Sequence, residues 1–131
     1  MGDQHGADLI FFNGTVMRGE PDHENLAGAE FLEEARTAEE YRLYSIDDRY
    51  PAMVRVERDG VTVPGELYGV PRSLWGKIEE SEPPGLRRDW VELSDGRAVY
   101  GMVGSHELTE GARDISDFGG WRAYRDRFAG S

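Results

Sequence analysis

Short apolar runs separated by polar turns recur along the chain, and this pattern predicts many strands and few helices. Residues 7–12 (ADLIFF) are apolar and aromatic, as is typical of a fully buried strand. Residues 41–46 alternate well enough to predict a further strand. Residues 30–37 suit a helix or a strand by propensity, so the pattern leaves both open.

Two longer segments carry the pattern of a tight hairpin. Residues 53–56 and 61–70 alternate on either side of Asp59-Gly60, a favoured turn pair. The segment DWVELSDGRAVYGMVG repeats this pattern around Asp95-Gly96. We therefore predict that the strands flanking each of these turns pair with one another.

The clearest helical segment is residues 72–81, where apolar side chains recur at helical spacing. These apolar side chains are Leu74, Trp75 and Ile78. Pro83 is expected to end the helix, because the residue before a proline is pushed away from helical geometry. The tail FGGWRAYRDRF predicts a short amphipathic helix, whose apolar side chains are Trp121, Tyr124 and Phe128.

Together these segments predict about five to seven short strands and one or two helices. The hairpin turns are too short for helical crossovers, so mainly antiparallel pairing is expected. We predict one α+β domain over residues 1–131, a small and mainly antiparallel β-barrel with flanking helices.

The composition narrows the classes of partner. The chain has 131 residues, 38% of them hydrophobic, which is enough for one packed core. A formal net charge of −11 repels phosphate backbones and anionic membranes, so neither nucleic acid nor a membrane is expected as partner. The absence of cysteine excludes thiol chemistry. The start of the chain, MGDQHGAD, lacks a secretory pattern, so a cytoplasmic protein is expected.

The first candidate site is Asn13-Gly14-Thr15-Val16, where the first apolar run gives way to a polar loop. Glycine permits backbone conformations closed to other residues, so successive N–H groups can converge on one point. Such a loop suits a carboxylate or a developing oxyanion. An ordinary turn after a strand is the alternative, and the residues alone do not decide between the two.

The second candidate is a carboxylate after the predicted helix. Glu82 lies between the helix end and two prolines, where a rigid backbone can aim its side chain. A carboxylate in a half-buried pocket has a raised pKa and can act as a base near neutrality, whereas a surface position is the plainer alternative. Tyr50 and Pro51, between two expected strands, either line a cleft or cover the core. The three histidines lack a metal-ligand spacing, so no metal or cofactor is expected.

In this order the fragments resemble the gamma-glutamylcyclotransferase-like family. The resemblance rests on the buried first strand with its Gly-Thr loop, on EARTAEEYRLYSI, RYPAMV and VPGELYGV, and on a glutamate ahead of RRDWVELSDGR. It extends over residues 9–121. The segment GARDISDFGGWRAY is similar to the closing segment of the C-terminal domain of allophanate hydrolases.

The resemblance implies a small barrel in which the amides of residues 14–16 line the substrate cavity, with Tyr50 and Pro51 nearby. Asn13 stands where the cyclotransferases usually have tyrosine. The general acid/base of the family matches Glu82, with Glu80 as the alternative. The implied reaction cyclises a gamma-glutamyl amide to 5-oxoproline and releases an amine, without a cofactor.

Three functions compete at this point. An enzyme acting on a small polar or anionic substrate predicts a pocket that holds a buried Glu82, and we favour it. A relative of the allophanate hydrolase domain, acting on a small carboxylated urea or amide, predicts a cation facing the ligand, from Arg18, His23 or Arg113. A binding or assembly module predicts an exposed Glu82 and an apolar face around Trp121 and Tyr124. A homodimer is a reasonable assembly for this chain.

Overall fold

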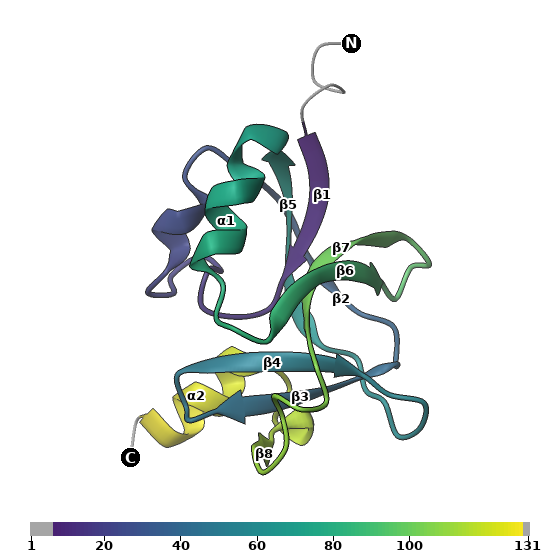
Figure 1. The fold of residues 1–131 in the computed structure, drawn as a ribbon. Coiled ribbons are helices and arrows are strands. Elements are labelled where there is room, and N and C mark those ends of the chain that lie inside the picture. The colour runs from purple at the N-terminus through teal and green to yellow at the C-terminus, as the bar shows by residue number, and fades with distance from the viewer. Residues whose placement is uncertain (1–6, 130–131) are drawn as a thin grey trace.

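In the computed structural model, which describes residues 7–129, eight strands form two sheets beside a few short helices (Figure 1). The larger sheet has the order β2 (Glu30–Arg36), β5 (Pro64–Pro71), β1 (Ala7–Phe12), β7 (Ala98–Gly104), β6 (Leu86–Glu92). The smaller sheet has the order β4 (Tyr50–Arg55), β3 (Tyr41–Ile46), β8 (Arg113–Asp114). The helices are η2 (His23–Leu26), η3 (Arg72–Leu74), α1 (Trp75–Ser81), η4 (Ser116–Phe118) and α2 (Trp121–Ala129).

The mixed α+β class is confirmed, but the described strands do not close into a barrel. Strand β1 pairs in parallel with β7, and the other strand pairs are antiparallel. The edge strands β2 and β6 approach each other just beyond their ends, where Thr37 bridges Leu93. No strand pairing within residues 7–129 joins these edges along their length or joins the two sheets. The structure is therefore two sheets packed together, which corrects the predicted barrel.

The hairpin predicted around Asp59-Gly60 is wrong, although the turn itself forms. Asp59 has a φ of 60°, as a tight turn requires, but β4 pairs with β3 whereas β5 pairs with β1 and β2. The turn wraps around the start of β3, because the N–H of Val61 donates to Tyr41 O at 2.7 Å. The chain thus passes from the smaller sheet to the larger one. The second predicted hairpin, β6 with β7, is confirmed.

The helix predicted over residues 72–81 is confirmed as η3 followed by α1. Trp75 and Ile78 are buried, and Glu82 leaves the helix with an extended backbone at φ −76° and ψ 143°, as the following Pro83 demands. Residues 30–36, left open between helix and strand, form β2. Strand β8 was not predicted, because its two residues are too few to show a hydrophobic pattern.

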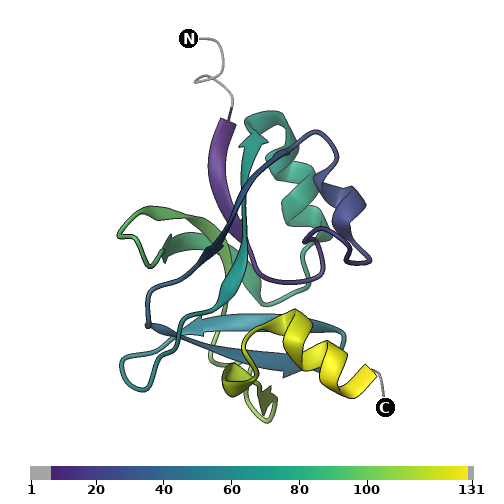
Figure 2. The same cartoon turned by 180° about the vertical axis from the view of Figure 1, so that it is seen from behind.

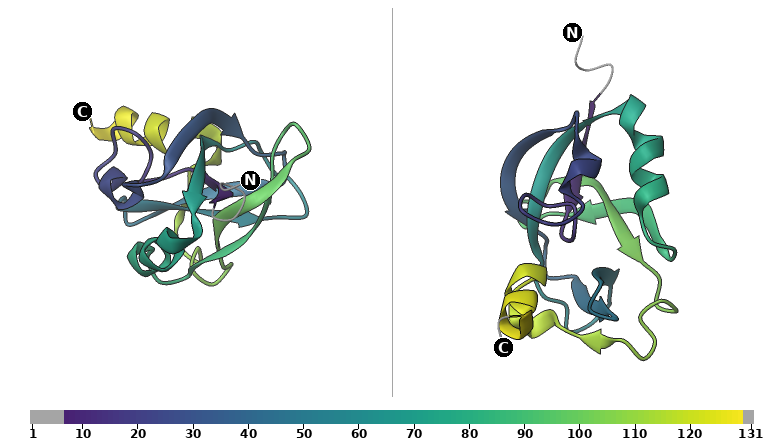
Figure 3. Two further views of the ribbon diagram at one scale, coloured as in Figure 1. Left: turned by 90° about the horizontal axis from the view of Figure 1, so that it is seen from above. Right: turned by 90° about the vertical axis from the view of Figure 1, so that its left-hand side faces the viewer.

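Two core clusters lie on opposite faces of the larger sheet. One contains Trp75 and Ile78 from α1, and the other joins the larger sheet to the smaller sheet and to α2. Seen from behind, α2 lies across the smaller sheet (Figure 2), and the side view places α1 and α2 at opposite ends of the molecule (Figure 3). Trp121 and Tyr124 are buried under α2 as its pattern predicts, whereas the side chain of Phe128 lies outside the described residues. Among the helices within residues 7–129, none has the length and hydrophobicity that crossing a membrane requires.

Gly76 offers a test of the helix assignment. It lies exposed in α1, and a Cβ added there would meet no heavy atom within 4 Å. Gly76→Ala is expected to raise the free energy of unfolding by about 0.5–1 kcal/mol, because alanine loses less backbone entropy in a helix. Urea denaturation with an unchanged m-value would measure this increase, and a lower midpoint would contradict the helical assignment.

Candidate functional site

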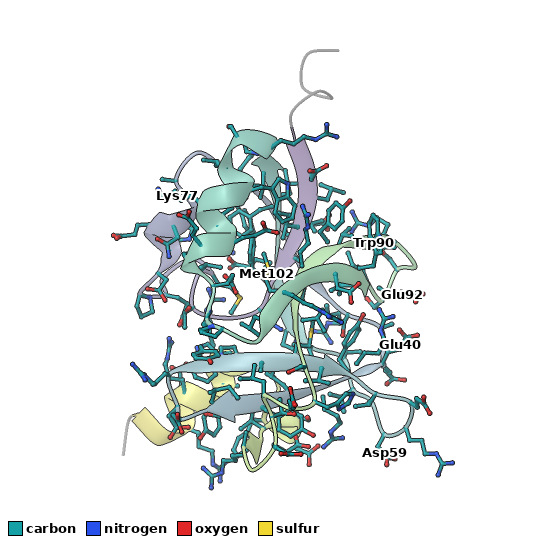
Figure 4. All side chains as sticks on the ribbon, viewed as in Figure 1. Glu40, Asp59, Lys77, Trp90, Glu92 and Met102 are labelled. Carbon is teal, nitrogen blue, oxygen red and sulfur yellow. The ribbon has the colours of Figure 1, made fainter. Side chains whose placement is uncertain are left out.

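One pocket lies where β1 ends, β4 begins and α1 ends. It is lined by all seven residues that the sequence singled out: Asn13, Gly14, Thr15, Val16, Tyr50, Pro51 and Glu82. Its remaining lining is apolar and consists of Phe11, Phe12, Pro83, Leu86 and Met102. Met102, labelled in Figure 4, lies near the C-terminal end of α1. The space measures about 400 Å³ with its open mouth included, and the cavity within it about 30 Å³, which is room for a small polar group.

The loop at the end of β1 uses its carbonyls and leaves its amides free. Gly14 O accepts a hydrogen bond from the N–H of Met17 at 3.1 Å, and Thr15 O accepts one from the N–H of Asp22 at 2.9 Å. Val16 O accepts from Nδ1 of His23 at 2.8 Å. Within residues 7–129, the N–H groups of residues 14–16 donate to no protein acceptor. A run of unpaired amides beside a pocket is suited to binding an anion or a developing oxyanion.

Contacts with β4 hold this loop in place. A Cβ added to Gly14 would lie 2.9 Å from both Cγ and Cδ of the buried Pro51, so the loop backbone approaches the proline ring more closely than any side chain would allow. The side-chain amide of Asn13 donates to Sδ of Met53 at 3.3 Å. Asn13 therefore ties the loop to the smaller sheet.

Glu82 enters the pocket from the residue that follows α1. Its side chain is half-buried, and no hydrogen-bond or ion-pair partner of its carboxylate occurs within residues 7–129. Burial, and then the negative charge of Asp22, raises the pKa of the Glu82 carboxyl to about 7. A group with this pKa can take up and return a proton near neutral pH. Glu80, the alternative base, is exposed and lies outside the pocket lining.

The side chains named for the competing functions are not among those that line the pocket. Arg18 pairs with Glu66 at 3.1 Å, and Arg113 lines a different hollow next to Tyr124. His23 supports the loop through Val16 O and is not among the residues that line the pocket. Trp121 and Tyr124 are 3% and 2% exposed, so they belong to the core of this chain and form no outward apolar face.

Sequence reasoning missed two buried carboxylates, Glu20 and Glu66, which lie next to the pocket loop. Glu66 interrupts an apolar run at a buried position of β5, and that interruption was a readable signal. Glu20 lies in a polar loop and gave no such signal. In the described part of the chain, no three His, Cys, Asp or Glu side chains are grouped as a metal ion would require.

Known proteins resemble this chain in both sequence and fold. A Vibrio cholerae protein named "Putative gamma-glutamylcyclotransferase" is 31% identical over 116 residues, which cover 86% of this chain and 94% of that protein. The crystal structure of a uropathogenic E. coli-specific protein has 40% identity and a TM-score of 0.89, and the match covers 93% of this chain and 98% of the other.

The match to a Kluyveromyces lactis allophanate hydrolase has 26% identity and a TM-score of 0.86. It covers 92% of this chain but 21% of the hydrolase, so this chain corresponds to one part of that larger protein. The allophanate hydrolase C-terminal domain family matches residues 9–126. This chain is therefore a member of the allophanate hydrolase C-terminal domain family and, as its sequence predicted, a gamma-glutamylcyclotransferase-like protein.

Proposed function

We propose that this chain is a small-molecule enzyme in which Glu82 is the general acid/base for the cyclisation of a gamma-glutamyl amide to 5-oxoproline. The observation that supports it most is the pairing, in one pocket, of a carboxylate of raised pKa with three amides that have no acceptor among residues 7–129. These are the two parts that an intramolecular attack on an amide carbonyl needs: a proton acceptor and a place for negative charge.

In the proposed reaction the α-amine of the substrate attacks its own γ-carbonyl carbon. A C–N bond forms, and the Glu82 carboxylate takes the proton that the attacking nitrogen loses. The amide C–N bond then breaks as the Glu82 carboxyl gives this proton to the leaving nitrogen. The products are 5-oxoproline and an amine, and the reaction is redox-neutral.

The loop and the walls of the pocket have separate tasks in this proposal. The amides of residues 14–16 bind the anionic carboxylate of the substrate or steady the charge on the carbonyl oxygen. Tyr50, Pro51 and the apolar lining hold the substrate in a folded shape that brings the amine to the carbonyl.

A second candidate function is action on a small carboxylated urea or amide. The specific observation in its favour is the family match over residues 9–126. The same amides would then bind the carboxylate of the ligand, and Glu82 would again exchange the proton.

A substrate panel distinguishes the two candidates. The purified chain is incubated with gamma-glutamyl amines, gamma-glutamyl dipeptides and allophanate, while 5-oxoproline and carbon dioxide are measured. Release of 5-oxoproline above the uncatalysed rate supports the cyclotransferase. If carbon dioxide is released from allophanate and no 5-oxoproline is formed, the second candidate is supported. If neither 5-oxoproline nor carbon dioxide is released, both proposals are overturned.

A further inference from the structure

A network of buried charges lies behind the pocket loop and outside the pocket lining. Its centre is Glu66 of β5, which is 1% exposed. One carboxylate oxygen accepts from the backbone N–H of Arg18 at 2.9 Å and from the hydroxyl of Tyr68 at 2.8 Å. The other oxygen accepts from Nε of Arg18 at 3.1 Å and from Nη2 of Arg122 at 3.3 Å. Burial acts to raise the pKa of Glu66, but these hydrogen bonds outweigh it and hold the pKa below its usual range.

Arg122 of α2 connects three parts of this network. Its guanidinium donates to Glu66 at 3.3 Å, to Glu20 at 3.3 Å and to the backbone oxygen of Arg18. Glu20 also accepts a hydrogen bond from Nη1 of Arg125, which lies one turn further along the same helix. The guanidinium of an arginine holds its donors in a planar, fixed fork, whereas the three donors of a lysine ammonium rotate about a single nitrogen.

The contacts of the network converge on residues 18–20, directly after the pocket loop of residues 14–16. Residues 17 and 22 in turn donate their N–H groups to the carbonyls of Gly14 and Thr15. Buried ion pairs add little net stability, because desolvation offsets much of the attraction between the charges. The arrangement does, however, fix the backbone that shapes the pocket loop, from β5 on one side and from α2 on the other.

We propose that Arg122 is a positioning residue, which holds residues 14–16 in the geometry that binds an anion. This role rests on the proposed function of the loop, since Arg122 itself is not among the residues that line the pocket. The final helix of the chain thereby sets the shape of a site built at the end of its first strand.

The test compares Arg122→Met with Arg127→Met. Arg127 lies on the same helix, is exposed and has no hydrogen bond or ion pair to another residue within 7–129, so it is a matched control. The dissociation constant of 5-oxoproline, measured by NMR titration of the loop amides, is expected to rise about tenfold or more in Arg122→Met because a displaced site loses binding geometry. Arg127→Met is expected to bind as the native chain does.

Hydrogen exchange separates this proposal from the proposed function. The amides of Met17 and Asp22 are bonded inside the loop, so they are expected to exchange faster in Arg122→Met, whereas the amide of Leu93, bonded to Arg97 O in the turn between β6 and β7, keeps its rate. This readout holds even if the native chain binds no 5-oxoproline. Unchanged exchange at Met17 and Asp22 in folded Arg122→Met would overturn the positioning role.

Arg122→Lys keeps the charge opposite Glu20 and Glu66, and it provides a second variant if Arg122→Met does not fold. Because a single lysine nitrogen does not reproduce the contacts that Nε and Nη2 of Arg122 make, loop exchange in Arg122→Lys is still expected to be faster than in the native chain. Native exchange and native affinity in Arg122→Lys would show that charge alone suffices, and would overturn the proposal that the guanidinium fork sets the loop.

Discussion

Glu82→Gln is expected to slow the release of 5-oxoproline by about 10²–10⁴-fold, the usual contribution of a general acid/base. Glutamine has nearly the same shape but cannot take the proton from the attacking amine. The measurement is kcat for whichever gamma-glutamyl amide the native chain turns over, with Glu80→Gln as the matched control because Glu80 is exposed and lies outside the pocket lining. Equal loss in both variants, or loss in Glu80→Gln alone, would move the base away from Glu82.

The same substitution is expected to stabilise the fold at alkaline pH. Folding raises the pKa of Glu82 from 4.5 to about 7, so between these values the folded chain holds a proton that the unfolded chain has released. Stability therefore falls as pH rises through this window, and glutamine avoids the loss. At pH 8 the free energy of unfolding of Glu82→Gln should exceed that of the native chain by about 2 kcal/mol, a value reduced from the full shift because the side chain is half-exposed.

Below pH 4.5 the two proteins should unfold with similar free energies, because the carboxyl is protonated in both states. Urea denaturation at several pH values would measure the difference. A gap that does not change with pH would mean that Glu82 ionises as easily in the folded chain as in the unfolded one. If Glu82→Gln loses activity but gains stability at alkaline pH, damage to the fold is not the cause of the lost activity.

The parts of the pocket that could be predicted are those written in short stretches of sequence. The Gly-Thr loop follows the buried residues 10–12 that end β1, and Glu82 follows a helix that a proline ends, so local rules were enough to single them out. The resemblance to a family added the expectation that these distant stretches share one cavity, and the structure brings them together.

The errors and omissions arise where distant segments decide the outcome. Asp59-Gly60 is a turn, yet β4 finds its partner in the preceding strand β3, and the bridge from Tyr41 to Val61 directs the chain elsewhere. The ion pair between Glu66 and Arg122 spans 56 residues, and charged residues are usually assigned to the surface. The apolar run around Glu66 signals that this carboxylate is buried, but no local pattern identifies Arg122 as its partner or β3 as the partner of β4.

Gly14→Ala is expected to lower kcat/KM by about 10²-fold, because a shift of the loop by a fraction of a contact distance removes amides from the position of the developing charge. The new Cβ would lie 2.9 Å from the ring of Pro51, which is buried at the start of β4 and has a rigid ring that cannot turn aside. The loop must therefore move, at a cost of about 1–3 kcal/mol in the free energy of unfolding, as for other overpacked sites.

Gly76→Ala is the matched control, since its Cβ meets no heavy atom within 4 Å and activity should be unchanged. The double variant Gly14→Ala with Pro51→Ala removes the ring atoms that the new Cβ would meet. If the contact is the cause, the double variant should recover part of the kcat/KM that Gly14→Ala loses, and the coupling energy of the cycle should be favourable. Full activity in Gly14→Ala would instead show that the amides of this loop do not contact the reacting group, and the anion would then have to bind elsewhere in the pocket.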